Sequence, residues 1–295
     1  MTKLVLAKLG GSVITRKDVP RCEDAATIER LADEVAEAFA LGGKGGDGEF
    51  RLVLGTGGGS FPHQVAHRHG VAKGLYGDED LALPSSQFES RLRALPPKRL
   101  AGFALTQDAA AEINRLVVRR LLARGLPAIS LQPSAFLYCD GGVVARSFVR
   151  PARNLLAVGA LPVVYGDVVT DLAKGCAIAS TEVTLALLAR ELKANRLVVC
   201  TDVDGVYSSD PRADPDAQLV GRITPRTFGE VRLWLGGSSS TDVTGGMLHK
   251  VQTLLALALE GVPSLVVNGR VPGRLRDALL GNEVVGTRIE AVERD

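Results

Sequence analysis

Short apolar runs of strand length alternate with amphipathic stretches of helical period along most of the chain. The runs that predict buried strands cover residues 4–8, 52–54, 128–131, 161–166, 196–202 and 264–267. Apolar residues at helical spacing predict helices over 28–39, from 64 onward, over 106–123, around 155, over 181–194, near 228 and over 246–259. This alternation predicts an α/β fold, a three-layer αβα sandwich with a largely parallel central sheet.

Glycine-centred stretches between these elements predict two β-hairpins, over residues 138–145 and 168–178. Residues 41–49 are rich in glycine but follow no strand, so we predict a flexible surface connection there. Residues 73–97 mix Gly, Leu, Pro and Ser with charges, which is typical both of a lid or pocket wall and of an ordinary surface excursion. No internal repeat divides the chain, so we expect a single domain over residues 1–295.

Composition narrows the class of protein. The chain has 295 residues and a net charge of +2, far from the strongly basic profile of a nucleic-acid-binding protein. Its four cysteines show no metal-binding spacing and no disulfide framework, which favours a reducing compartment. The N-terminal run contains a lysine, and no run approaches the ~18 apolar residues of a membrane helix. We therefore expect a cytoplasmic protein with no nucleic-acid or membrane partner.

Three glycine-rich turns predict sites for anions. In residues 52–63 a strand leads into Gly57, Gly58 and Gly59, and a helix begins just behind them, at His63. Consecutive glycine N–H groups can point into one concavity, and a helix N-terminus adds positive partial charge. Residues 8–12 form a second such turn and residues 244–250 a third. One such turn alone is as readily an ordinary connection, whereas three together predict phosphate on both sides of a reaction.

The strand ends also carry candidate polar groups. Asp167 follows one predicted strand through Gly166, and residues 201–204 close another. The carboxyl ends of parallel strands meet at one edge of a sheet, where ligands of such folds bind. We therefore expect one crevice to collect residues 8–11, 55–59, 166–167 and 201–204.

Taken in order, these motifs resemble those of the amino acid kinase family. They are Lys8-Leu-Gly-Gly-Ser12 with Lys17, Gly57-Gly-Gly-Ser-Phe-Pro-His63, Leu131-Gln-Pro-Ser134, Tyr165-Gly-Asp167, Thr201-Asp-Val-Asp-Gly205, Ser240-Thr-Asp-Val-Thr-Gly-Gly-Met247 with Lys250, and Asn268-Gly269. A histidine after the triple glycine is typical of the branch that phosphorylates a phosphate or phosphonate. The resemblance implies the amino acid kinase fold, ATP as phosphoryl donor, and conversion of isopentenyl phosphate to isopentenyl diphosphate. It also implies a homodimer, with residues 1–170 as the acceptor lobe and 171–295 as the nucleotide lobe.

Phosphoryl transfer requires alignment and neutralisation of charge more than covalent chemistry. The catalytic candidates are therefore Lys8, Lys250 and His63, with Asp167 holding the lysines in place. Nucleotide-binding candidates are Gly10, Gly11, Ser12, Lys17, Thr201, Asp202, Asp204, Gly205 and Gly246. Acceptor-binding candidates are Gly57, Gly58, Gly59, Ser60, His63 and Gly166. Mg²⁺ is implied as a cofactor, and no protein ligand is assigned to it because phosphates can hold the ion.

The chain departs from the family pattern at two places. Thr56 stands where relatives commonly have histidine, and Ser180-Thr-Glu-Val183 replaces Ser-Gly-Asp-Asp, with Glu182 able to stand in for the first acid. Two other functions stay open: a kinase of another small phosphate or phosphonate such as fosfomycin, and a non-catalytic nucleotide or oxyanion binder. A prenyl acceptor needs apolar surface, for which Phe103, Leu105 and residues 75–83 are candidates. Lys8 and Lys250 are expected to face a solvated crevice.

Overall fold

One eight-stranded sheet organises the protein, for which a computed structural model describes residues 3–16, 18–42, 50–76, 97–236 and 246–291. Its strand order is β12-β14-β13-β9-β1-β2-β6-β3, and its neighbouring strands pair in parallel except β13 and β14. The strands are β1 (Lys3–Leu9), β2 (Phe50–Thr56), β3 (Ala128–Ser130), β6 (Leu161–Tyr165), β9 (Arg196–Thr201), β12 (Arg222–Ile223), β13 (Ser264–Asn268) and β14 (Thr287–Ile289).

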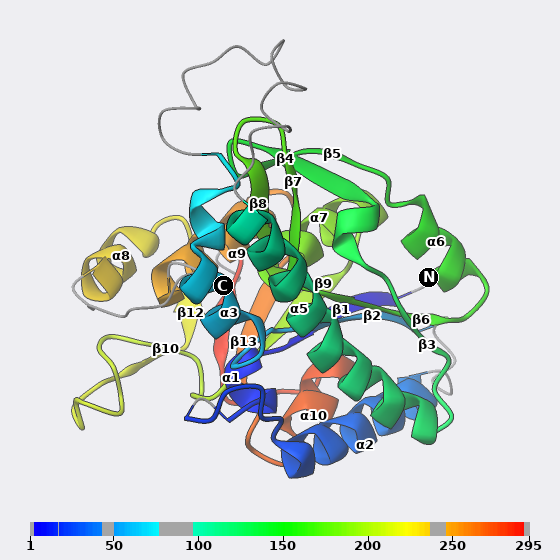
Figure 1. Cartoon of the computed structure of the whole chain (residues 1–295). Coiled ribbons are helices and arrows are strands. Elements are labelled where there is room, and N and C mark those ends of the chain that lie inside the picture. Colours follow the sequence, from blue (N-terminus) through cyan, green and yellow to red (C-terminus); the bar gives the residue numbers. More distant parts are fainter. Residues whose placement is uncertain (1–2, 17, 43–49, 77–96, 237–245, 292–295) are drawn as a thin grey trace.

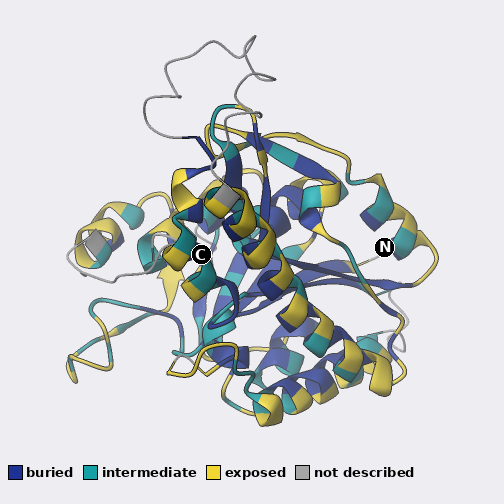
Figure 2. Cartoon of the chain, in the orientation of Figure 1, coloured by how far each residue is buried: buried dark blue, intermediate teal, exposed yellow. Residues whose placement is uncertain are grey.

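Helices cover both faces of this sheet (Figure 1). Leu4 and Leu6 of β1 pack into one hydrophobic cluster and Val5 and Ala7 into the other, so the two-residue period of the strand supplies both faces. The first face is covered by α6 (Arg150–Ala157), α7 (Thr181–Leu192), α8 (Phe228–Gly236) and α9 (Gly246–Leu259). The second is covered by α1 (Gly11–Ile14), α2 (Ala25–Gly42), α5 (Pro97–Ala123) and α10 (Arg274–Leu280). The predicted three-layer αβα sandwich is confirmed, with buried strands between helices whose outer faces are exposed (Figure 2).

A second, smaller sheet lies beyond the carboxyl end of β6. It joins β4 (Leu137–Asp140), β5 (Val143–Ser147), β7 (Asp167–Asp171) and β8 (Gly175–Ala179) in the order β5-β4-β7-β8. Both predicted hairpins are confirmed, but their union through β4 and β7 was not predicted, because it pairs residues far apart in the chain. The buried Asp171 carboxylate joins the two turns by accepting N–H bonds from Gly142 (2.7 Å) and Lys174 (2.7 Å).

Several predicted boundaries were wrong. Helix α5 begins at Pro97, not at residue 106, and its first turns pack against α3 (Pro62–His69). At Gly102 a side chain would meet the Cβ of His69 at 2.3 Å, so glycine permits this close packing. The short elements β10 (Val206–Tyr207), β11 (Leu219–Val220), β12, β14, α1 and α10 were not predicted, because few residues carry little periodic signal.

Some predictions fall outside the described residues. The connection predicted over 41–49 begins as the end of α2, and residues 43–49 are not described. Of the irregular stretch 73–97, only its two ends are described. Within the described part of the chain, none of the helices combines the length and apolarity needed to cross a membrane.

Candidate functional site

The carboxyl ends of five parallel strands meet at one edge of the large sheet. Leu9 lies in register with Thr56 and with Cys200, while Thr56 pairs with Tyr165 and Thr201 with Asn268. The residues that follow these strand ends are Gly10, Gly57, Gly166, Asp202 and Gly269. The prediction that residues 8–11, 55–59, 166–167 and 201–204 lie at one edge is therefore confirmed, whereas part of the third glycine turn lies outside the described residues.

Two of the glycine-rich turns pack directly against each other. A side chain at Gly11 would lie 2.3 Å from the nitrogen of Gly59, and one at Gly57 would lie 2.3 Å from the nitrogen of Gly11. Thr15 joins the turns further, since its hydroxyl donates to the Gly11 carbonyl (2.7 Å) and accepts from the Ser60 N–H (3.0 Å). The turns after β1 and β2 thus form one unit, and Thr15 is a contributor that the sequence analysis missed.

Other candidate glycines also have a packing reason. Added side chains would meet the Cys200 carbonyl at Gly10 (2.3 Å), the Pro62 ring at Gly58 (2.2 Å) and the Thr287 hydroxyl at Gly205 (2.4 Å). Gly166 is less crowded, with Thr181 at 3.0 Å, and Gly246 opens α9 with a φ of 63°. Close packing therefore requires several of these glycines, whether or not a phosphate binds beside them.

Lys8 forms an ion pair with Glu182, the residue that replaces the first aspartate of the family's Ser-Gly-Asp-Asp pattern. The side chains of Lys8 and Glu182 are 11% and 13% exposed and form an ion pair. Helix α7 approaches β2 closely at Gly55, where a side chain would meet Leu185 at 2.7 Å. Because Gly55 is the register partner of Lys8, this approach carries Glu182 to the lysine. The expectation that Lys8 faces a solvated crevice was wrong, since its side chain is buried and paired.

The positive charges of Lys8 and Lys250 both act on the Glu182 carboxylate. Burial alone would raise the pKa of this carboxyl, but the charges of Lys8 and Lys250 and the hydrogen bond from Lys8 hold the pKa at about 2. Glu182 also lies in the first turn of α7, whose N-cap Ser180 accepts from the Val183 N–H (3.2 Å). The Lys8 ammonium thus binds a carboxylate at the edge of the sheet, and the charge of Lys250 acts on the same carboxylate.

We expect Glu182→Gln to reduce the acid sensitivity of folding. A carboxyl whose pKa is about 2 in the folded chain, against an ordinary value of 4.5, contributes stability above the unfolded value and loses it as pH falls through the folded value. The shift corresponds to about 3 kcal/mol at neutral pH. Urea unfolding from about pH 7 to pH 2 measures this difference, with the exposed Glu230→Gln as control. Parallel pH curves for wild type and Glu182→Gln would contradict it.

Asp167 is buried at the start of β7, below the same edge. Its carboxylate accepts N–H bonds from Ser134 (3.0 Å) and from Val168 (2.9 Å). Burial raises the pKa of this carboxyl, and these hydrogen bonds oppose the rise. These contacts tie the Ser134 turn to β7. The acid bonded to Lys8 is Glu182, whereas the role of Asp167 in holding the lysines in place stays a prediction.

His63 is the second residue of α3, immediately after the packed glycine turns, and its side chain is partly buried. Ala66, one turn further along α3, belongs to a small apolar cluster with Val71, Leu75, Val168 and Cys176. Phe103 and Ile178 pack against this cluster. Leu105 is 46% exposed and is not a member, so only part of the predicted apolar material gathers here.

The predicted nucleotide residues form two linked polar groups. Ser12 donates to Asp202 (2.8 Å), which also pairs with Arg212. Asp204 accepts from Asn268 (3.1 Å) and pairs with Arg274, while Thr201 donates to the Val203 carbonyl (2.8 Å). Sequence analysis missed both arginines, because neither belongs to a recognised motif. Lys17, Thr244 and residues 239–242 lie outside the described residues.

Each of the two departures from the family pattern places a threonine at a buried position, Thr56 and Thr181. Thr56 is fully buried and accepts from the Asn114 amide (3.2 Å), while Ser130 donates to Asn114 from the other side (2.6 Å). Thr181 donates to the Thr56 carbonyl (2.9 Å). Threonine at both positions thus helps to join β2, β3, α5 and α7.

Comparisons with known proteins agree with this architecture. Residues 3–268 match the model of the amino acid kinase family. The chain is 38% identical to isopentenyl phosphate kinase of Methanothermobacter thermautotrophicus, over 97% of this chain and 98% of that protein. It is 31% identical to the enzyme of the same name from Methanocaldococcus jannaschii, over 98% and 100%. A solved structure described as isopentenyl phosphate kinase superimposes with a TM-score of 0.77 at 36% identity, covering 97% of this chain and 99% of that one.

Proposed function

The chain belongs to the amino acid kinase family, and on this premise we propose that it transfers a phosphoryl group from ATP to isopentenyl phosphate. In the reaction, an acceptor phosphate oxygen bonds to the γ-phosphorus of ATP, the bond to ADP breaks, and isopentenyl diphosphate forms. The observation that carries the proposal is the Lys8–Glu182 ion pair at the edge of the sheet, beside packed glycine turns that lead to His63.

The acceptor needs no general base in this reaction. A phosphate monoester has a second pKa near ~6 and is largely dianionic at neutral pH, so its attacking oxygen is already ionised. The obstacle is repulsion between two anions, which positioned donors and positive charges reduce. We assign Lys8 and Lys250 to the migrating phosphoryl group and His63 to the acceptor phosphate. We propose that Asp167, which accepts a hydrogen bond from the Ser134 N–H, helps to hold the two lysines in place.

The glycine turns divide between the two substrates. We assign Gly57, Gly58, Gly59, Ser60 and Gly166 to the acceptor phosphate. We assign to the nucleotide Gly10, Gly11, Ser12, Lys17, Thr201, Asp202, Asp204, Gly205 and Gly246. In the strand order, β1, β2, β6 and β3 form one half of the sheet and β9, β13, β14 and β12 the other. The first glycine turn, assigned to the nucleotide, follows β1, the strand that borders β9 where the two halves meet. Residues 1–170 thus form the proposed acceptor lobe and 171–295 the nucleotide lobe.

Mg²⁺ enters the proposal as part of the nucleotide substrate. Among the residues that the structure describes there is no group of three or more His, Cys, Asp or Glu side chains suited to a metal ion. These residues do not form a protein cage for Mg²⁺, and phosphate oxygens are ligands that this ion accepts readily. No role assigned to a residue here depends on it.

The apolar cluster around Ala66 supports a prenyl acceptor. One of its members, Ala66, lies one turn along α3 from His63, and we propose that the hydrocarbon chain of the acceptor packs near Phe103 and Ile178 beside this cluster. We also propose a homodimer, which the exposed Leu122 and Ile129 beside the edge strand β3 support. A cytoplasmic location is part of the proposal, supported by four cysteines that are all free thiols.

The function is tested with a panel of acceptors incubated with ATP and Mg²⁺. We expect isopentenyl phosphate to be the acceptor with the highest kcat/KM. Formation of its diphosphate is monitored by ³¹P NMR. Fosfomycin and phosphate monoesters without a hydrocarbon tail serve as the comparison. Preferred turnover of fosfomycin would instead identify a phosphonate kinase, and ATP binding without turnover of any acceptor would identify a nucleotide binder.

A further inference from the structure

The turn at the end of β13, formed by Asn268, Gly269 and Arg270, contacts nucleotide candidates at or after the end of β9 and also the first glycine turn, which follows β1. The Gly269 N–H donates to the Thr201 carbonyl at the end of β9 (2.8 Å). The Asn268 amide donates to Asp204 (3.1 Å), and the Arg270 guanidinium donates to the Ser12 carbonyl (2.8 Å). A displacement of this turn would therefore move residues of two strand ends and of the first glycine turn together.

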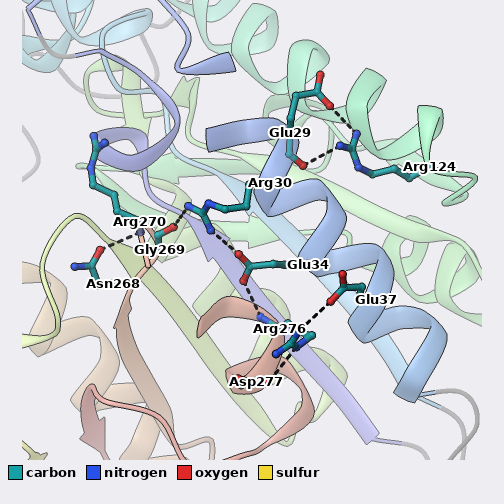
Figure 3. Close-up of polar contacts among 10 residues, drawn as sticks. All are labelled: Glu29, Arg30, Glu34, Glu37, Arg124, Asn268, Gly269, Arg270, Arg276 and Asp277. Carbon is teal, nitrogen blue, oxygen red and sulfur yellow. Dashed lines mark hydrogen bonds and ion pairs between the residues drawn. The ribbon is translucent and has the colours of Figure 1, made fainter. Parts of the chain in front are cut away.

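Arg30 of α2 holds this turn from the opposite side (Figure 3). One nitrogen of its guanidinium donates to the Gly269 carbonyl (2.6 Å), and another pairs with Glu34 one turn along the helix. The second oxygen of Glu34 accepts the Arg276 N–H (3.1 Å) in the first turn of α10. A guanidinium can make two such bonds at once in fixed directions, which an ammonium cannot. The pair thus fixes the turn relative to α2 and α10.

The Arg30–Glu34 ion pair is largely buried, unlike an ordinary surface ion pair. The Glu34 side chain is 6% exposed and that of Arg30 is 25% exposed. A buried ion pair contributes little net stability compared with apolar side chains of similar volume. Stability alone therefore gives no reason for an arginine here, whereas orientation of a backbone carbonyl does.

We propose that Arg30 is a positioning residue for the nucleotide: anchored by Glu34, it holds the Gly269 carbonyl and so orders the turn that orients Asp204 and Ser12. The inference rests on the proposed function, because it assumes that these residues contact ATP. It adds a residue that lies 27 positions before Gly57 and belongs to no phosphate motif.

Three variants test this inference. Arg30→Met removes the contact with Gly269 but leaves Glu34 unpaired. Arg30→Met combined with Glu34→Gln leaves no unpaired charge and keeps an acceptor for the Arg276 N–H. Arg276→Met is the matched control, because its side chain pairs with Glu37 across the same two helices and with Asp277 on its own helix rather than with the turn. The Kd of ATP without acceptor, the KM of each substrate and the melting temperature are measured for all.

We expect both Arg30 variants to raise the Kd and KM of ATP by about tenfold, because misplaced contacts weaken a preorganised site. The KM of isopentenyl phosphate should stay near the wild-type value, and Arg276→Met should leave ATP binding unchanged. The proposal is overturned if the folded double variant binds ATP as wild type does. Failure of wild type to phosphorylate isopentenyl phosphate would contradict the proposed function, while the comparison of ATP affinities would still decide the role of Arg30.

Discussion

Replacing Lys8 by Met is expected to lower kcat by about 100-fold or more. The charge removed is buried beside the edge where the phosphoryl group would migrate, and loss of one preorganised group from a transition state costs on this scale. Methionine retains the length and apolar stem of lysine at a buried position. Lys250→Met should have an effect of similar size, because both charges act on Glu182. Steady-state kinetics with saturating ATP and acceptor measure the change.

The effect on catalysis must be separated from an effect on folding. Lys8→Met removes the ion-pair partner of the largely buried Glu182 carboxylate, so the free energy of unfolding of this variant should fall. The double variant Lys8→Met with Glu182→Gln avoids that unpaired charge and should be stable yet equally slow. Lys3→Met is the matched control, since Lys3 lies on the same strand but is exposed. Near-normal kcat in folded Lys8→Met would remove this lysine from the mechanism.

The second large effect is expected at His63. His63→Ala should lower kcat/KM for the acceptor roughly 30- to 1000-fold if the imidazole donates to the acceptor phosphate as an oxyanion-hole group does. This range corresponds to a loss of about 2–4 kcal/mol of transition-state stabilisation. His63→Gln should retain part of the activity, because an amide is also a donor. ATP affinity should be nearly unchanged in both variants. The exposed His67→Ala, one turn along the same helix, is the matched control.

The pH profile provides an independent test of the same role. If the charged imidazolium orients the acceptor, wild-type activity should fall on the alkaline side, and this fall should be absent from His63→Gln. An alkaline fall that persists in His63→Gln would assign it to another group. Loss of ATP affinity in His63→Ala, with acceptor handling intact, would place the glycine turn on the nucleotide side instead.

Much of the architecture was encoded locally. The alternation of apolar runs and amphipathic stretches predicted the long strands and helices, because backbone period and burial depend on neighbouring residues. Glycine and polar residues just after strands predicted the active edge, since parallel strands all end there. The position of Lys8 follows from the same logic: it is the next-to-last residue of β1 and lies two residues after Leu6, on the face that packs against α7.

The tertiary structure decided the contacts that depend on the approach of distant segments. Glu182 reaches Lys8 only because glycine at position 55 lets α7 lie close to β2, and no local pattern encodes that distance. The union of the two hairpins through Asp171 and the reach of Arg30 to Gly269 across 239 positions are of the same kind. Sequence predicted which residues stand at the edge, whereas close packing decided which charges meet there, because ion pairing depends on separations of a few ångströms.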